Sequence, residues 1–181
     1  APNKSRKALT FAMDWIDTPL GPMLAIADDT HLHMLEFVER KKLQDHVDRY
    51  RKAFNATVLP GDTKALKLIR KELADYFAGK NLDFKSKIAG AGTEFQNDVW
   101  DELRRVPPGV TRSYLEMAER IGRPTVVRAV ANANRLNRCA IILPCHRVIG
   151  ADGTLTGYAG GLWRKQWLLD HERRHTGQTL L

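Results

Sequence analysis

The spacing of apolar residues divides the chain into a first half with strands and two helices and a second half that is mainly helical. Three short apolar runs in the first half, separated by turns that contain Pro or Gly, are typical of β-strands. These strands are expected at residues 11–16, 23–27 and 31–38. Residues 41–54 and 64–78 instead carry apolar side chains at helical spacing, and Gly79 suits the left-handed conformation that ends a helix.

This pattern predicts a small α/β lobe over residues 11–91, preceded by a mobile basic arm at residues 1–10. Nothing in the lobe indicates chemistry, so we expect it to have a structural role. A second domain is expected over residues 92–175, after a polar connector that contains glycine.

Helix-capping signals define the elements of the second domain. A Thr or Ser followed three residues later by Gln or Glu is a capping box, and it occurs at Thr93 and at Ser113. The helices expected here cover residues 93–106, 113–121 and 125–136, the last of them capped by Thr125. A short helix, a turn containing Gly122 and a second helix are typical of a helix-turn-helix.

An apolar run that leads into three polar, reactive side chains is the most unusual stretch of the sequence. Residues 139–143 predict a short buried strand, which Pro144 ends because proline cannot donate to a sheet. Cys145, His146 and Arg147 follow directly. Cationic neighbours lower the pKa of a thiol, and the thiolate is the nucleophilic form of cysteine. Spacing alone supports a nucleophile at Cys145 and, equally, a buried structural cysteine beside a surface histidine.

Two more elements are expected after this stretch. Asp152-Gly153 is a hairpin signal between short strands at residues 148–149 and 155–156. A final helix is expected at residues 162–173, and residues 176–181 are expected to form a disordered tail. The packing residues of that helix are expected to be Leu162, Trp163, Trp167, Leu168 and Leu169.

Composition and charge narrow the class of protein. The 181 residues contain no apolar run of membrane-spanning length and no hydrophobic signal segment near the start. Cys139 and Cys145 are the only cysteines, which excludes a disulfide framework and a cysteine-based zinc site and suits a reducing cytoplasm. The net charge is +8, and residues 104–147 hold nine arginines, no lysine and two acids, so nine minus two places +7 in that stretch. An anionic partner is favoured there.

The helix expected at residues 125–136 points to the same kind of partner. Apart from Arg128 and Arg135, most of its side chains are small or short. Small residues allow a helix to approach a groove closely, and arginine neutralises phosphate. The same composition also fits a helix packed in a core, and both interpretations can hold on opposite faces. The arginine cluster favours contact with DNA.

The segment Pro144-Cys145-His146-Arg147-Val148 resembles the signature of the O6-alkylguanine-DNA alkyltransferases (methylated-DNA–protein-cysteine methyltransferases). Other segments follow in the order and spacing of that family. They are Thr93-Glu94-Phe95-Gln96, Val99-Trp100, Pro107-Pro108-Gly109, Ser113-Tyr114, Arg128-Ala129-Val130, Asn137 and Gly157-Tyr158-Ala159-Gly160-Gly161. The resemblance is strong over residues 92–172 and weaker before them. Leu136 and Arg138 depart from it, because many relatives have Gly and Pro beside the Asn.

The resemblance implies an α/β (α+β) fold: a small ribonuclease-H-like lobe, then a mainly helical domain with a helix-turn-helix and a short strand pair carrying the nucleophile. It implies that Cys145 attacks, that His146 draws the thiol proton through a water and that Glu172 orients His146. Asn137 completes the implied catalytic set. The implied substrate-binding residues are Tyr114, Arg128, Val148, Tyr158, Ala159 and Lys165. The implied DNA-binding residues are Ser113, Val127, Arg128, Ala129 and Arg135.

The implied function is DNA repair without a metal or cofactor. A methyl or small alkyl group would pass irreversibly from O6 of guanine, and also from O4 of thymine, to Cys145, once per molecule. The target base would flip out of the duplex while Arg128 takes its place in the stack. We expect a cytoplasmic monomer whose partner is double-stranded DNA containing O6-alkylguanine.

Two other functions compete with this one. The chain begins with Ala rather than Met, which predicts a processed chain or the last domain of a longer protein. It could then be the terminal DNA-binding module of a methylation-responsive transcriptional regulator. A Cys–His hydrolase is disfavoured because it leaves the arginine-rich helix unexplained.

Overall fold

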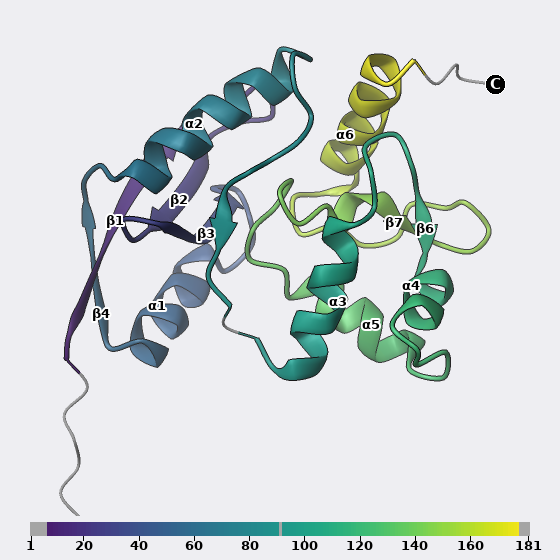
Figure 1. The fold of residues 1–181 in the computed structure, drawn as a ribbon, viewed down its shortest axis with the longest axis horizontal. Coiled ribbons are helices and arrows are strands. Elements are labelled where there is room, and N and C mark those ends of the chain that lie inside the picture. The colour runs from purple at the N-terminus through teal and green to yellow at the C-terminus, as the bar shows by residue number, and fades with distance from the viewer. Residues whose placement is uncertain (1–6, 91, 178–181) are drawn as a thin grey trace, which may run out of the picture.

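The computed structural model describes residues 7–90 and 92–177, which form a sheet-based lobe and a helical domain (Figure 1). The sheet of the lobe has five strands in the order β4-β1-β2-β3-β5. They are β1 (Leu9–Ile16), β2 (Met23–Ala27), β3 (His31–Phe37), β4 (Ala56–Pro60) and β5 (Lys87–Ile88). The first three strands pair antiparallel, while β4 pairs in parallel with β1 and β5 in parallel with β3.

Both faces of this sheet are covered. Helix α1 (Leu43–Ala53) packs on the face that carries Leu24 and Ile26. Helix α2 (Lys64–Phe77) and the helical domain pack on the opposite face, which carries Met23 and Ala25. Because successive strand residues point to opposite faces, β2 is buried at every position.

The predicted elements of the lobe are confirmed within a few residues, but the sequence pattern misses both edge strands. β4 is a short apolar run that ends in Pro60 and is mostly exposed, and β5 has only two residues, so neither gives a strand signal of its own. β1 begins at Leu9, so Leu9 and Thr10 belong to the sheet and not to the predicted arm. The remainder of that arm, residues 1–6, lies outside the described residues.

The helical domain contains α3 (Glu94–Arg104), α4 (Tyr114–Arg120), α5 (Val127–Arg135) and α6 (Leu162–His175). A parallel pair of short strands, β6 (Arg112–Ser113) and β7 (Val148–Ile149), lies among them. Both predicted capping boxes are present, at Thr93 and at Ser113. Helices α4 and α5 follow one another across a short turn and pack together, which is consistent with the predicted helix-turn-helix.

Three local predictions in this domain are wrong. Thr125 caps no helix: a turn in which Val126 N donates to Arg123 O (3.1 Å) leads into α5, whose N-cap Val126 makes no side-chain cap bond. Residues 139–143 are buried but form turns, because only Cys139 bridges to β3 and Ile141 adopts a left-handed φ of 72°. The turn at Asp152-Gly153 exists, yet β7 pairs in parallel with β6, and residues 155–156 form no strand.

The last helix is longer than predicted, and only some of the predicted packing residues are buried. Leu168 and Leu169 are buried, whereas Leu162 and Trp163 at its first turn are 48% and 56% exposed. Thr176 and Gly177 follow it, and the rest of the predicted tail, residues 178–181, lies outside the described residues. In the part of the chain that the structure describes, no helix has the length and apolar character needed to cross a membrane.

The lobe and the helical domain share a core. One cluster of buried apolar side chains runs from the sheet and α2 into α3, α5 and α6. The backbone is continuous across the same boundary: Leu35 N of β3 donates to Arg138 O at 2.9 Å, and Ala140 N donates to Leu35 O at 2.8 Å. The site described next lies beside this junction.

Candidate active site

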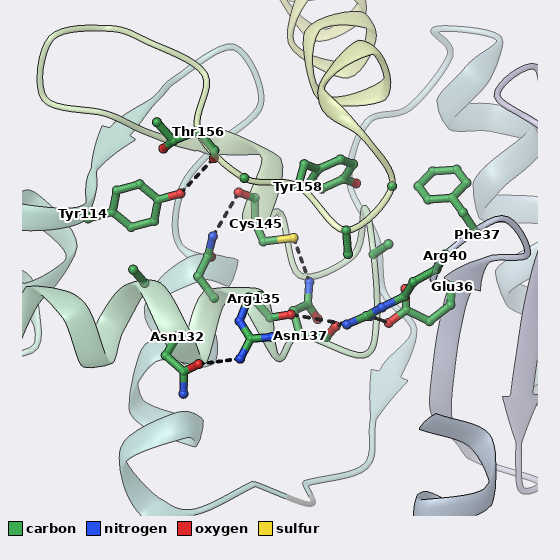
Figure 2. A pocket seen from close by; sticks show the side chains of 16 residues that line it. Glu36, Phe37, Arg40, Tyr114, Asn132, Arg135, Asn137, Cys145, Thr156 and Tyr158 are labelled. Carbon is green, nitrogen blue, oxygen red and sulfur yellow. Dashed lines mark hydrogen bonds and ion pairs between the residues drawn. The ribbon is translucent and has the colours of Figure 1, made fainter. Parts of the chain in front are cut away.

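Cys145 begins a one-turn 3-10 helix, η1 (Cys145–Arg147), on the wall of a cavity of about 560 Å³ (Figure 2). Cys145 is 8% exposed and lines this cavity. The volume lies within the range of small-molecule sites in proteins. The cavity walls come from β3, α5, η1 and the loop at residues 156–160.

Two asparagines hold the nucleophile segment. Asn137 Nδ2 donates to Cys145 Sγ (3.2 Å) and to Leu143 O (2.8 Å), and its Oδ1 accepts from Cys139 N (2.8 Å). Asn134 of α5 donates from Nδ2 to Cys145 O at 3.4 Å. The resemblance implied Asn137 but not Asn134, whose position on the buried face of α5 is visible only in the fold.

The thiol is not activated in the way the sequence suggested. Burial raises the pKa of Cys145 to about 11, and the hydrogen bond from Asn137 only partly offsets that rise. We expected His146 and Arg147 to lower this pKa, but both side chains point to Glu172 instead. Cys145 is therefore a neutral thiol in the free protein, and a base must remove its proton for it to attack.

Glu172 of α6 is fully buried and accepts bonds from three side chains. His146 Nε2 lies 2.7 Å from Oε1, and Tyr76 Oη donates to the same oxygen at 2.8 Å. Arg147 donates from Nη2 to Oε1 (2.8 Å) and from Nε to Oε2 (2.9 Å). Burial alone would raise the pKa of Glu172, but the charges and hydrogen bonds of His146 and Arg147 outweigh it and hold the pKa well below its usual range.

The carboxylate of Glu172 fixes which ring nitrogen of His146 carries the proton. Burial lowers the pKa of His146, against the pull of Glu172, so the ring is neutral at neutral pH. An ionised carboxylate can only accept, so Nε2 carries the proton and Nδ1 has a free lone pair. Among the described residues Nδ1 has no hydrogen-bond partner, although it is buried. The imidazole can therefore act as a base through Nδ1.

Of the implied substrate-binding residues, Tyr114, Tyr158 and Ala159 line the cavity and Lys165 supports its loop, whereas Arg128 and Val148 do not line it. Tyr114 lines it and donates from Oη to Thr156 O at 3.2 Å. Tyr158 and Ala159 line it from the loop, and burial raises the pKa of Tyr158 well above its usual value. Lys165 Nζ is buried behind this loop and donates to Val148 O (2.6 Å) and Thr156 O (3.0 Å). Burial lowers the pKa of Lys165 to about 8.

The first lobe also contributes to the site, contrary to the purely structural role predicted for it. Glu36, Phe37 and Arg40 line the cavity on the side away from Tyr114 (Figure 2), and Tyr76 binds Glu172. Burial raises the pKa of Glu36 to about 7, against the charge of Arg40. The sequence assigned none of them a role, because Glu36 and Phe37 lie in an apolar strand and Arg40 lies in a charged turn that looks like ordinary surface.

The implied DNA-binding residues lie on or near one face of α5. Arg128 and Ala129 are exposed, Val127 is half-buried, and Val130 and Ala133 are buried on the opposite side. The helix therefore packs in the core on one face and exposes Arg128 and Ala129 on the other, so DNA contact at the exposed face stays a prediction. Arg135 is exposed and donates from Nη2 to Asn132 Oδ1 at 2.8 Å, and Ser113 serves as the cap of α4.

Comparison with known proteins identifies the family. The model of the 6-O-methylguanine DNA methyltransferase DNA-binding domain matches residues 94–174, and the model of the ribonuclease-like domain of the same enzyme matches residues 13–89. The chain belongs to the 6-O-methylguanine DNA methyltransferase family.

Relatives in this family align along most of the chain. A methylated-DNA–protein-cysteine methyltransferase of Methanosarcina barkeri is 41% identical over 166 residues, which cover 90% of this chain and 97% of that protein. One from Salmonella typhimurium is 41% identical over 163 residues, covering 87% of this chain and 92% of that protein. The crystal structure of the Mycobacterium tuberculosis O6-methylguanine methyltransferase superposes with a TM-score of 0.79 at 39% identity, covering 91% of this chain and 94% of that one. A structure of the M. tuberculosis protein in complex with DNA superposes with a TM-score of 0.77 at 38% identity, covering 92% of this chain and 94% of that one.

Proposed function

We propose that this protein repairs alkylated DNA by moving an alkyl group from O6 of guanine to Cys145 Sγ, once per molecule. The observation that carries the proposal is the position of Cys145: it lines a cavity, its sulfur accepts a hydrogen bond from Asn137, and it adjoins a histidine that burial keeps neutral and Glu172 orients. The names of the relatives support a methyltransferase and lend no support to the regulator alternative.

The transfer exchanges one bond for another. His146 Nδ1 takes the thiol proton, through a bridging water as the family resemblance implies, while Glu172 stabilises the resulting imidazolium. The thiolate attacks the alkyl carbon, so the S–C bond forms as the C–O6 bond breaks and its electron pair stays on the purine. The purine takes up one proton and His146 releases the one it held, so the net change moves the thiol proton to guanine.

The other residues of the cavity bind the flipped base. Tyr114 Oη, exposed at the cavity edge, donates to the purine and helps to extrude it, and Tyr158 walls the pocket. The backbone at Val148 and Ala159 offers further contacts. Lys165 acts from behind the loop, because its Nζ already holds Val148 O and Thr156 O in place. These roles come from the family resemblance and agree with the positions of the side chains.

Duplex DNA binds along α5, where Arg128 and Ala129 are exposed. Arg128 enters the base stack in place of the flipped guanine, and the small neighbours allow the helix to lie in the minor groove. Ser113, Val127 and Arg135 contact the backbone of the same duplex. The protein acts as a monomer and also accepts O4-alkylthymine.

A labelled-methyl experiment tests this proposal. Incubation with duplex DNA that contains O6-[methyl-³H]methylguanine should place the label on the peptide that carries Cys145. Cys145→Ala should take up no label and still bind the duplex, whereas Cys139→Ala should take up label normally. Label on the Cys139 peptide, or on neither, would refute the assignment.

A further inference from the structure

Arg40 of the first lobe reaches into the helical domain at the end of the helix that faces DNA. It follows β3, is 9% exposed, and is ion-paired with Glu36 of the same strand, which is 3% exposed. Its Nη1 donates to Asn137 O at 3.1 Å and its Nη2 points to Arg135 O at 3.4 Å. These carbonyls belong to the end of α5 and the residues just after it, where helix carbonyls lack intrahelical partners.

The same short segment is held by the backbone of β3. Leu35 bonds to Arg138 O and to Ala140 N, the residues on either side of Cys139. Residues 135–140 are therefore attached to the first lobe at four points, two through the backbone of Leu35 and two through the Arg40 guanidinium.

Asn137 lies between these attachments and the nucleophile. Its backbone carbonyl accepts from Arg40, while its side-chain Nδ2 donates to Cys145 Sγ at 3.2 Å (Figure 2). An amide donor favours a thiolate only if it stays aimed at the sulfur. A shift of the Asn137 backbone would move the donor, and the guanidinium opposes such a shift.

The buried ion pair between Arg40 and Glu36 is not explained by a contribution to stability alone. A buried ion pair is weak evidence for stability, because removing two charges from water offsets much of their attraction. The pair also lines the cavity beside Cys145, and its two charges act on the thiol with opposite signs. Its position links the first lobe to the reacting atom.

We propose that Arg40, held by Glu36, is a positioning residue for the nucleophile: it fixes Asn137 against Cys145 and thereby favours the thiolate. The inference rests on the proposed function only in taking Cys145 as the nucleophile. It assigns the first lobe a part in the chemistry, through a residue that does not touch the substrate.

The test measures thiolate formation directly and without DNA. The rate at which iodoacetamide alkylates Cys145, read by peptide mass, is followed from pH 6 to pH 10 in each variant. Below the midpoint the thiolate fraction rises about tenfold per pH unit, so the displacement of each profile along the pH axis gives the shift of its midpoint. The titratable or charged groups around the sulfur are Glu36 and Arg40 from β3 and its turn, His146 beside it, Tyr158 from the loop and Lys165 from α6. The variants change only the first two.

The two members of the pair should act in opposite directions. Arg40→Met should raise the pH midpoint of alkylation by about one unit, which is about tenfold less thiolate at neutral pH. Glu36→Gln should lower the midpoint, because it removes the negative charge and leaves Arg40 near the sulfur. Arg40→Lys keeps the charge but cannot fork onto two carbonyls, so it should give a smaller upward shift. In the repair reaction, Arg40→Met should lower the transfer rate at saturating duplex and leave duplex affinity unchanged.

Arg70→Met is the matched control, since Arg70 pairs with Asp14 and Asp62 inside the first lobe and does not line the cavity. It should lower the melting temperature and leave the alkylation midpoint in place. If Arg40→Met behaves like Arg70→Met, or if Arg40→Lys leaves the midpoint unchanged so that charge alone acts on the thiol, the positioning role is wrong. If Arg40→Met does not fold, an unchanged midpoint in Arg40→Lys overturns the proposal. Iodoacetamide needs no alkylated base, so failure of the repair function would leave this readout intact.

Discussion

Replacing Glu172 with Gln should both destabilise the protein and slow transfer, because it removes a charge at the centre of a fully buried network. Glu172 is 0% exposed and accepts from His146, Arg147 and Tyr76. Gln keeps the volume but leaves the Arg147 guanidinium, itself 5% exposed, without a counter-charge. Breaking one side of a buried pair costs about 3–5 kcal/mol, and the isosteric amide places the expected loss near 3 kcal/mol. For a chain of this size that is a fall of about 6–12 °C in melting temperature.

The loss should depend on pH with a definite sign. The pKa of Glu172 is held below its usual range in the folded protein, so ionised Glu172 contributes stability above the unfolded pKa. That contribution is lost as the pH falls toward the folded pKa. The difference in unfolding free energy between wild type and Glu172→Gln should therefore be largest from about pH 6 to pH 8 and should shrink as the pH falls below about 4.

Urea unfolding at several pH values measures this difference, and Glu102→Gln is the matched control. Glu102 is also buried, but its partners Arg105 and Arg120 have side chains 72% and 50% exposed and regain water when the carboxylate is lost. We expect its loss to be about 1 kcal/mol or less. Glu172→Gln should also slow transfer, because an amide can hold His146 in the tautomer that blocks Nδ1. A loss no larger than that of the control, or one that does not change with pH, would refute the reasoning.

Three further predictions follow from the site. Arg128→Ala should slow repair of duplex DNA far more than reaction with free O6-benzylguanine, and Arg128→Lys should not rescue it because it lacks a planar stacking surface; equal losses on both substrates would show that Arg128 serves the pocket or the fold. Methylation of Cys145 should lower stability by about 1–3 kcal/mol, seen as a lower melting temperature, because a thioether adds volume and cannot ionise; an unchanged melting temperature would contradict this. Tyr158→Phe should cost less than about 1 kcal/mol in urea unfolding, because Tyr158 Oη is buried without a hydrogen-bond partner among the described residues; a larger loss would reveal a bond that this geometry lacks.

The fold was predictable where local signals decide it. The strands of the first lobe alternate or run apolar, and the capping boxes at Thr93 and Ser113 fix the starts of α3 and α4. Predictions failed where a distant partner decides the conformation. β4 is a strand because β1 offers it an edge, and residues 139–143 form turns because a single bridge at Cys139 is all the sheet they meet.

The residues of the candidate site can likewise be separated into those with a local sequence signal and those that only the fold brings together. Cys145, His146 and Asn137 lie within ten consecutive residues, and the family resemblance supplied Glu172 and Lys165 from α6. Glu36 and Arg40 have no local signature, and the resemblance assigned Tyr76 no role. Only the packing of the first lobe against the helical domain brings these three residues to the site. The same packing explains why Arg147 holds Glu172 and does not activate the thiol.

The most direct test of the central claim is the stoichiometry of transfer. The protein is mixed with increasing amounts of duplex DNA containing O6-methylguanine, and intact mass is recorded until no further change occurs. The repaired guanine should reach a plateau at one methyl per chain, with every chain heavier by one methyl substitution at Cys145. Repair that continues past this plateau without an added thiol or a second protein would contradict transfer to Cys145 as an irreversible, single event.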